Sequence, residues 1–548
     1  ADPTGLWLTE RVWEQDVVPA LLDAGVRYTV VDDTMFHGVG VTDEDLTGAF
    51  VTEQDGRPLL LYAGDRRLRY LIPYRKVARV IEHVTGDDRL YVYADDGEKF
   101  GEWPDTHERV YGEGWLESLF TALEEADGVT MVTLGEHARE AVPVGRVYLP
   151  SSSYDEMMTW ALPPEPRLKL GKARRALEKE DPEGLLPFLR GAPWRSFFAK
   201  YPEVNHLQKR MLMVSRALRA GDNVPDDALK ELYRAQCNCA YWHGAFGGVY
   251  LSFMRGALWH HLMKAEAMVG RPTAAAVREV DVDADARPEI VVTAPWGVAV
   301  FAPHRGGSMI ELDDWRGGAN LLAVVARHRE AYHLADENPP PDDLDDDEMA
   351  AIQARSEVDR DSLVFDEAGH GALIDLIDGA RVDESYEYEV DGGGRVRMWV
   401  ESGGLRIEKA AVADADELLT TYTLTNVSGT SLKATFGSRA SVMPLVLGRD
   451  VGSDIVESTS TSWRVGHPEA EVGLAVEVSN PASIATEDLA TASATLEGLQ
   501  SMHQGTQVTM EWALDLEPGA EVSFELRWRP EINDAALAKK DRGVSAGV

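Results

Sequence analysis

The chain has 548 residues, 44% of them hydrophobic, a length that predicts roughly two to four domains with sizeable cores. Its 54 Lys and Arg against 93 Asp and Glu give a formal net charge of −39, which argues against nucleic acid or an anionic membrane surface as a partner. The two cysteines, Cys237 and Cys239, are too close in sequence to staple distant elements. Neither a signal peptide nor a membrane-spanning apolar run is recognisable, so we expect a soluble cytoplasmic protein.

Short apolar runs alternate with amphipathic stretches over residues 1–165. Leu6 to Leu8 predicts a strand, Val17 to Leu22 a helix, and Tyr28 to Val31 the next strand. Further strands are expected at Leu90–Ala94, Val129–Leu134 and Arg146–Leu149. Because strands and helices alternate, this segment predicts a parallel α/β sheet or barrel, in which chemistry gathers where strands end.

The periodicity changes twice along the remaining chain. Residues 166–272 are mostly helical, most clearly over His206–Ala220 and Phe253–Val269, and predict a helical subdomain that completes the active site. Residues 273–535 carry many short alternating strands with turn signals, which predicts a β-sandwich. Within that domain we expect a solvated insertion at Asp336–Glu348, and we expect a frayed tail over residues 536–548.

Two acidic motifs follow strand-like runs near the start of the chain, one around Glu10 and one around Asp96. A retaining glycosidase needs a carboxylate nucleophile and a carboxylic acid about 5–5.5 Å apart. Gly97 permits a tight turn after Asp96, and the acidic neighbours of Asp96 favour a raised pKa, as a general acid requires. From the residues alone, a strand-end Glu10 paired with Arg11 and a merely solvated or metal-binding turn at Asp96 stay open.

Aromatic residues supply candidate sugar contacts. The segment Gln236–Leu251 mixes Asn, His, Trp and glycines, so that Trp242 is expected to stack on a sugar face and His243 to hydrogen-bond hydroxyl groups. Trp103 and Trp194 are further stacking candidates, with core packing as the alternative for each. The Cys-x-Cys pair beside a histidine lacks an evident fourth ligand, which argues against zinc.

An acidic segment at Asp281–Asp285 alternates Asp with small residues, as calcium-binding loops do. Ala286 stands where such a loop has glycine, and Val292 stands where the bidentate Glu would be, so the segment is not an EF-hand. A weaker structural calcium site and a solvated acidic turn both stay open.

Several longer motifs occur in an order typical of one family. They are Gly5–Trp13, Leu68–Arg75, Asp95–Gly101, Val147–Pro150, Trp194–Asn205 and Lys209–Ser215. Together they resemble glycoside hydrolase family 57, specifically its 4-α-glucanotransferase and α-amylase branch. The resemblance implies a multidomain α/β plus all-β protein with an N-terminally incomplete (β/α)7-type barrel, a helical subdomain and a C-terminal β-sandwich.

The resemblance also implies roles for individual residues. Glu10 falls on the nucleophile and Asp96 on the acid/base. Positions that line the family's sugar subsites fall on Trp7, Asp33, His37, Glu98, Trp103, Trp194, Trp242 and His243. Three departures accompany these assignments: His37 replaces a His-Phe pair directly after the Asp pair, Cys239 stands where some relatives have Asp, and the family's N-terminal stretch with a His-Gln-Pro motif is missing. We therefore expect a chain that begins partway through its catalytic domain.

The resemblance implies a retaining enzyme acting on α-1,4-glucans or maltooligosaccharides, first a 4-α-glucanotransferase. An α-amylase and a truncated, non-catalytic glucan-binding remnant are the alternatives. No cofactor and no catalytic metal are required, and a structural calcium ion is left open. We expect no nucleic-acid or membrane partner, and a homodimer is left open.

Overall fold

The computed structural model falls into two compact units. Unit 1 comprises Ala1–Ser196 with Leu334–Glu348, and unit 2 comprises Phe197–His333 with Met349–Val548. The described residues are 3–103, 105–221, 224–244, 248–337, 363–391, 393–414, 416–447, 454–495 and 498–536. The expected insertion lies outside them from residue 338 on, as does the expected tail from residue 537 on. The predicted boundaries at 165, 272 and 535 remain predictions.

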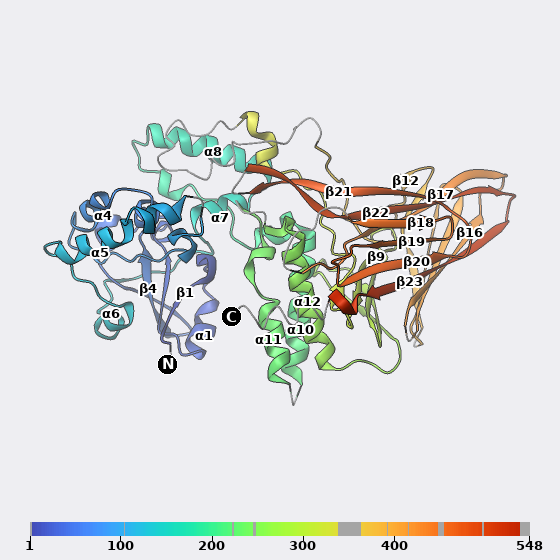
Figure 1. Ribbon diagram of the computed structural model, residues 1–548, viewed down its shortest axis with the longest axis horizontal. Helices are drawn as coiled ribbons and strands as arrows, with labels where there is room; N and C mark the ends of the chain where they lie inside the picture. The colour runs from blue at the N-terminus through green and yellow to red at the C-terminus, as the bar shows by residue number, and fades with distance from the viewer. Residues whose placement is uncertain are drawn as a thin grey trace. The chain divides into compact units, whose positions relative to one another are not determined.

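Unit 1 is built on a five-stranded mixed sheet with the order β1-β2-β4-β3-β5 (Figure 1, blue). The strands are β1 (Gly5–Trp7), β2 (Tyr28–Asp32), β3 (Phe50–Gln54), β4 (Arg57–Gly64) and β5 (Gly145–Arg146). The β1–β2, β2–β4 and β3–β5 pairs are parallel, and β3–β4 is antiparallel. Because β1, β2 and β4 run in one direction, the residues that follow them meet at one edge of the sheet.

Helices follow most strands of unit 1, as the alternating pattern predicted. They are α1 (Val17–Asp23), α2 (Asp33–His37), α3 (Arg66–Leu71), α4 (Val77–Val84), α5 (Trp115–Glu125), α6 (Leu134–Glu140), α7 (Asp155–Trp160) and α8 (Pro164–Lys179). Trp13 anchors the core of this unit: it is fully buried, and its indole donates to the Leu149 carbonyl at 3.2 Å.

Two predicted strands of unit 1 are wrong. Leu90–Ala94 forms no strand. Leu90 N–H donates to the Thr47 carbonyl at 3.3 Å, and the Val92 carbonyl accepts from Asp65 N–H at 2.8 Å. Val129–Leu134 is irregular up to Leu134, where α6 begins. An apolar run becomes a strand only where a neighbouring segment can form regular backbone hydrogen bonds with it. The sequence of the run does not show whether such a neighbour exists.

Three long helices open unit 2, at the two places predicted and one more. They are α10 (Pro202–Ala220), α11 (Asp226–Arg234) and α12 (Ser252–Val269). The boundary between the units falls at the start of the short helix α9 (Ser196–Lys200), thirty-one residues later than the predicted domain boundary at residue 165. Among the described residues, no helix is both long enough and apolar enough to cross a bilayer.

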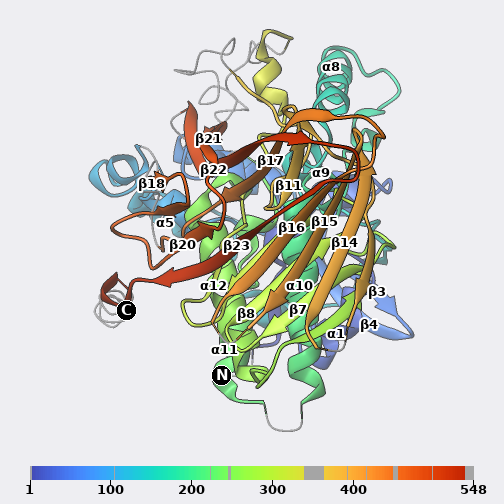
Figure 2. The ribbon, with the colours of Figure 1, turned by 90° about the vertical axis from the view of Figure 1, so that its right-hand side faces the viewer.

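All strand pairs of the three sheets of unit 2 are antiparallel over the residues described. The orders are β10-β9-β8-β7-β6, β12-β11-β17-β22-β21 and β13-β14-β15-β16-β23-β20-β19-β18. The strands not discussed further are β10 (Ala319–Asn320), β11 (Ile374–Ile377), β12 (Ala380–Arg381), β13 (Glu387–Val390), β17 (Leu432–Val442), β18 (Ile455–Thr459), β19 (Ser462–Gly466), β20 (Val472–Val478), β21 (Ser483–Thr495) and β22 (Gly498–Leu516). Strands used below are β6 (Ala276–Val280), β7 (Glu289–Ala294), β8 (Gly297–Ala302), β9 (Ser308–Asp314), β14 (Arg395–Ser402), β15 (Leu405–Ala413), β16 (Leu418–Asn426) and β23 (Glu521–Ile532). Figure 2 shows β14, β15 and β16 side by side, and the β7–β8 hairpin has the predicted turn at Pro295-Trp296.

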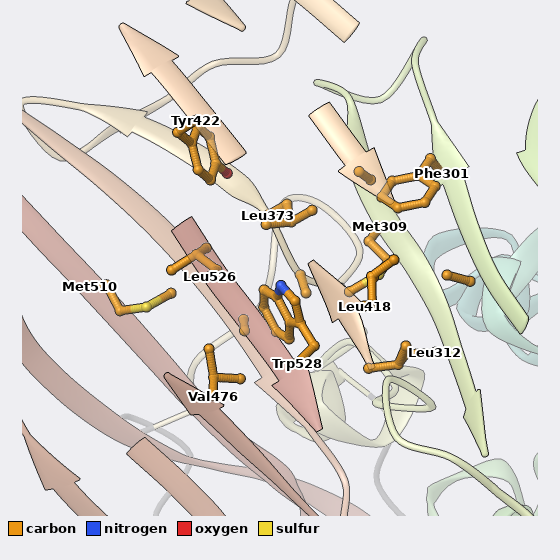
Figure 3. Packing of buried hydrophobic residues seen from close by; sticks show 14 of the residues in the cluster. Phe301, Met309, Leu312, Leu373, Leu418, Tyr422, Val476, Met510, Leu526 and Trp528 are labelled. Carbon is orange, nitrogen blue, oxygen red and sulfur yellow. The ribbon is translucent and has the colours of Figure 1, made fainter. Parts of the chain in front are cut away.

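One large apolar cluster joins these sheets (Figure 3). Phe301 of β8, Tyr422 of β16 and Trp528 of β23 are fully buried in it. Alternating positions of β15 and β16 are buried and half-buried in turn, as expected for strands with one face on a core. Unit 2 is therefore held together by apolar packing between antiparallel sheets.

Candidate functional site

The backbone turns sharply where β1 ends. Glu10 and Arg11 both have positive φ, 50° and 49°, in the short 3-10 turn Thr9–Arg11. The left-handed region is costly for residues with a Cβ, and two in succession mark a locally strained segment of the kind that gathers at functional sites. The turn places Glu10 at the sheet edge where the parallel strands end.

The Glu10 carboxylate accepts a hydrogen bond from the Tyr154 hydroxyl, which lies directly before α7. Burial, and then the Glu10 charge, raises the pKa of Tyr154 well above its usual value, so the phenol stays protonated and continues to donate. Arg11, only 5% exposed, lies over the Tyr154 ring with 4.2 Å from guanidinium carbon to ring centroid. Tyr154 and Arg11 thus fix the surroundings of Glu10.

Asp95 and Asp96 have different environments although they are adjacent. Asp95 is buried and accepts from Lys99 Nζ at 2.6 Å and from Tyr93 Oη at 3.3 Å. Asp96 is half-buried, and burial followed by the Asp95 charge raises its pKa. A carboxyl with a raised pKa beside a second carboxylate is an arrangement that general-acid chemistry uses.

A set of buried charges links the ends of several elements of unit 1. We call it the unit 1 charge cluster; it consists of Arg11, Asp32, Arg69, Asp95 and Lys99. Arg69 lies 3.6 Å from Asp32 and 3.5 Å from Asp95, and Arg11 lies 3.7 Å from Asp32. The charges of Arg11, Lys99 and Arg69 all act to lower the pKa of Asp96, against burial and Asp95. Arg11, the residue that follows Glu10, therefore interacts electrostatically with Asp96.

Asp33 and His37 lie at opposite ends of α2. Asp33 accepts the Arg66 backbone N–H at 2.8 Å through Oδ2, while its Oδ1 is buried with no hydrogen-bond donor among the described residues. Burial and the neighbouring Asp32 raise the pKa of Asp33 well above its usual value. His37 Nε2 lies 3.3 Å from the exposed Asp43. Asp33 thus offers an unused polar atom, and His37 lies beside an acidic loop.

The other predicted sugar contacts of unit 1 keep accessible surface. Trp7 is 37% exposed, and Glu98 is exposed on the 3-10 turn Gly97–Phe100. Trp103 stacks on Tyr74 with 6.5 Å between centroids, and Trp194 is half-buried. Aromatic faces with free area are what a sugar ring packs against.

Trp242 and His243 belong to unit 2, unlike the other eight predicted site residues. Both are buried, at 8% and 2% exposed. His243 Nε2 shares a hydrogen bond with the Tyr332 hydroxyl at 2.8 Å, and its ring packs edge-on against Tyr250 at 4.8 Å. The sugar-binding roles of both residues stay predictions.

Sequence reasoning missed Tyr154, Asp32, Arg69 and Lys99 as site residues. Arg69 and Lys99 lie inside motifs that carried the family resemblance, which was the available signal. Tyr154 is 144 positions from Glu10 and follows a serine run with no chemical signature, so only the fold reveals it. The sequence left open an alternative in which Glu10 pairs with Arg11; in the structure Arg11 lies 3.7 Å from Asp32.

Two groups of acidic and histidine side chains among the described residues are close enough to hold a metal ion. Both lie in unit 2, around Asp281–Asp285, and neither includes a cysteine or a predicted catalytic residue.

Comparison with known families covers most of the chain in three parts. The model of glycosyl hydrolase family 57 matches residues 1–150. The models of the alpha-amylase/4-alpha-glucanotransferase middle domain and C-terminal domain match residues 192–269 and 281–392. The order of these matches defines a carbohydrate-active enzyme of the alpha-amylase/4-alpha-glucanotransferase type.

Individual relatives agree with the family models. A 4-alpha-glucanotransferase from Thermococcus litoralis is 34% identical, over 96% of this chain and 82% of that protein. Its crystal structure matches with a TM-score of 0.82 over the same shares of the two chains, at 32% identity. An alpha-amylase from Pyrococcus abyssi is 38% identical over 68% of this chain but only 57% of that protein. The chain belongs to glycosyl hydrolase family 57.

Proposed function

We propose that this protein is a retaining 4-α-glucanotransferase acting on α-1,4-glucans, with Glu10 as nucleophile and Asp96 as acid/base. The observation that carries the assignment of roles is the contrast between the two carboxyls. Burial and the charge of Asp95, which accepts from Lys99, raise the pKa of Asp96, whereas Glu10 accepts a hydrogen bond from the Tyr154 phenol. One carboxyl is suited to donate a proton and the other to attack as an anion.

In the first half-reaction a Glu10 oxygen attacks the anomeric carbon. The bond from that carbon to the glycosidic oxygen breaks as Asp96 transfers its proton to the departing oxygen. The products are a glycosyl ester on Glu10, an ionised Asp96 and a shortened glucan with a free hydroxyl. The Tyr154 hydrogen bond orients the attacking carboxylate, and Arg11 stabilises the negative charge that Asp96 gains.

In the second half-reaction an acceptor hydroxyl enters. Asp96 removes the proton of the acceptor hydroxyl while the acceptor oxygen attacks the anomeric carbon. The bond between that carbon and Glu10 then breaks. Two inversions give net retention of the anomeric configuration. A glucan hydroxyl as acceptor gives transfer, and water gives hydrolysis. The relatives at similar identity carry both names, so the acceptor is what the experiment must determine.

The architecture that we propose for the family's full fold is a (β/α)7-type barrel followed by helices and a β-sandwich. Three parallel strand pairs in unit 1 and the wholly antiparallel sheets of the described part of unit 2 support it. In this arrangement Glu10, Asp33 and Asp96 lie at the carboxyl edge of the parallel strands. Within unit 1, Trp7, Glu98, Trp103 and Trp194 then bind the glucan. Trp242 and His243 are kept as proposed sugar contacts on the basis of the family resemblance alone.

Incubation of the chain with purified maltotetraose tests the proposal. We expect a ladder of shorter and longer oligosaccharides with no net increase in reducing ends. An increase in reducing ends equal to the bonds cleaved would instead identify an α-amylase. Glucan binding without turnover would identify a non-catalytic glucan-binding protein and overturn the enzymatic proposal.

The roles of the two carboxyls are tested with an α-glycosyl fluoride as donor and azide as a replacement nucleophile. Asp96→Ala with azide should give the α-glycosyl azide, because azide needs no general base in the second half-reaction. Glu10→Ala with azide should give the β-anomer by a single inversion. Reversed anomers would exchange the two assignments. Glu117→Gln, an exposed acid on α5, is the matched control and should behave as the parent chain does.

A further inference from the structure

The loop between β6 and β7 in unit 2 carries three carboxylates close together. Asp281, Asp283 and Asp285 each offer an oxygen, and the three atoms lie within 4.8 Å of one another. Acidic loops are common on a chain with a net charge of −39, so this cluster carries no argument by itself. The residues that pack behind the loop supply the argument.

Glu289, the first residue of β7, is fully buried behind this loop. Its Oε2 accepts the Val282 backbone N–H at 2.7 Å, but its Oε1 has no hydrogen-bond donor among the described residues. A buried carboxylate oxygen without a hydrogen-bond donor carries a desolvation cost that no hydrogen bond offsets. Its presence calls for a positive group that the neighbouring side chains do not supply.

His304, in the turn between β8 and β9, faces the same point. Its Nε2 lies 3.5 Å from Glu289 Oε1 and 3.3 Å from Asp285 Oδ2, and it makes no hydrogen bond among the described residues. Burial, then the charge of Arg305, lowers the pKa of His304, which favours the neutral imidazole with a free lone pair. One oxygen each of Asp285 and Glu289 and a ring nitrogen of His304, from three segments, therefore lie within 4.8 Å of one another.

The local charge is far from balanced. Arg305 pairs with Asp283 and lies 3.5 Å from Asp285, and it is the cation recorded in ion-pair contact with these carboxylates. Its side chain is 37% exposed, so it can move into solvent. Among the described residues the acidic side chains here thus outnumber the cations in ion-pair contact with them, which favours the binding of a further cation.

We propose that this convergence is a binding site for a structural calcium ion. Its ligands would be the side chains of Asp281, Asp283, Asp285, Glu289 and His304. Four carboxylates make the donor set rich in oxygen, which suits calcium better than zinc, and the imidazole completes the shell on the buried side. The sequence lacks an acid at position 292, where a calcium loop places its last ligand; Glu289 and His304 stand in for it from the two neighbouring segments.

The ion would tie the β6–β7 loop to the start of β7 and to the β8–β9 turn. The ion would displace the Arg305 guanidinium from Asp283 and Asp285, and it is bound by the folded chain alone. Calcium should therefore raise the melting temperature in a concentration-dependent way. This effect belongs to the stability of unit 2 and is independent of the reaction proposed above.

The full chain, stripped with EDTA and desalted, is titrated with CaCl2 by calorimetry and by thermal unfolding. We expect one calcium ion per chain and a melting temperature that rises with each tenfold increase in calcium. ZnCl2 and MnCl2 are titrated in parallel. No calcium binding by the parent chain overturns the proposal, and so does a preference for zinc that depends on His304 but not on Asp281.

Variants assign the binding to this loop. Glu289→Gln and Asp283→Asn should each weaken calcium binding at least tenfold and abolish the thermal response, and the exposed Asp281→Asn provides a variant that leaves the core untouched. The control is Asp391→Asn, whose carboxylate accepts the Gly393 and Arg395 backbone N–H groups at 2.9 and 3.1 Å in another turn. Calcium binding that survives in Glu289→Gln, Asp283→Asn and Asp281→Asn would overturn the assignment.

Discussion

Two acidic segments, Asp95–Glu98 in unit 1 and Asp281–Asp285 in unit 2, resemble each other in sequence but differ in their surroundings. In unit 1 the buried carboxylate of Asp95 is held by Lys99 at 2.6 Å and by Arg69 at 3.5 Å. In unit 2 the partly exposed Arg305 forms an ion pair with Asp283 of the loop. A buried oxygen of Glu289 has no hydrogen-bond donor among the described residues.

The difference lies in where the positive charge comes from. In unit 1 the protein supplies its own cations, Lys99 and Arg69, to Asp95, and the Asp95 charge adds to burial in raising the pKa of the adjacent Asp96. In unit 2 the positive charge is left for a ligand to bring. The chemistry of an acidic motif is thus decided by the side chains that other segments place around it.

The largest effect expected is at the nucleophile. Glu10→Gln keeps an oxygen that accepts the Tyr154 hydrogen bond but removes the attacking anion. Transfer between maltooligosaccharides should fall by on the order of 10⁴-fold or more, with an unchanged melting temperature. Activity within tenfold of the parent chain would contradict the assignment of Glu10 as the nucleophile.

The acid/base variant should have the next largest effect. Asp96→Asn removes the proton donor, and glucan transfer should fall by about 10²- to 10⁴-fold. An α-glycosyl fluoride needs no protonation of its leaving group, so the first half-reaction should be far less affected with this donor. Equal losses with both donors, measured under single-turnover conditions, would exclude Asp96 as the acid.

A smaller effect, on the pH profile of activity, tests the role of the Asp95 charge in raising the pKa of Asp96. Asp95→Asn removes the like charge that raises the pKa of Asp96 and leaves Lys99 and Arg69 to lower it. Because Asp96 must be protonated to act as the acid, the basic limb of kcat/KM should move to lower pH. A shift to higher pH, or none, would show that Asp95 does not tune its neighbour.

The smallest effect is on stability in unit 2. Burial raises the pKa of Glu289 from 4.5 to about 7, so the calcium-free folded state keeps a proton that the unfolded state has lost between these values. Stability should fall as pH rises from about 4.5 to 7, by on the order of 1 kcal/mol per pH unit. Chemical unfolding over this range checks it: Glu289→Gln should flatten the slope, and a parent chain with no such slope would contradict it.

Periodicity located most elements correctly because the burial of one face imposes it directly. The helices around His206–Ala220 and Phe253–Val269 and the β7–β8 hairpin follow from spacing and turn residues. Leu90–Ala94 was wrong because its apolar pattern is that of a strand, whereas a strand also needs a neighbour with a matching register.

The candidate site was only partly predictable from the sequence. Glu10 and Asp96 stand in recognisable motifs, but the raised pKa of Asp96 depends chiefly on burial, which its turn does not encode. Tyr154 reaches Glu10 from a distant segment. Likewise, only the folded structure shows that Glu289 Oε1 has no hydrogen-bond donor among the described residues. Such relations between segments appear only once the chain is folded.

The left-handed turn at Glu10 and Arg11 has a consequence for engineering this enzyme. Glycine adopts these backbone angles freely, so Glu10→Gly should relieve strain of about 1 kcal/mol while destroying the proposed nucleophile. The inactive Glu10→Gly chain would then be the more stable one. A thermostability screen that does not also demand turnover would enrich for loss of Glu10, so heat resistance and activity must be selected together at this position.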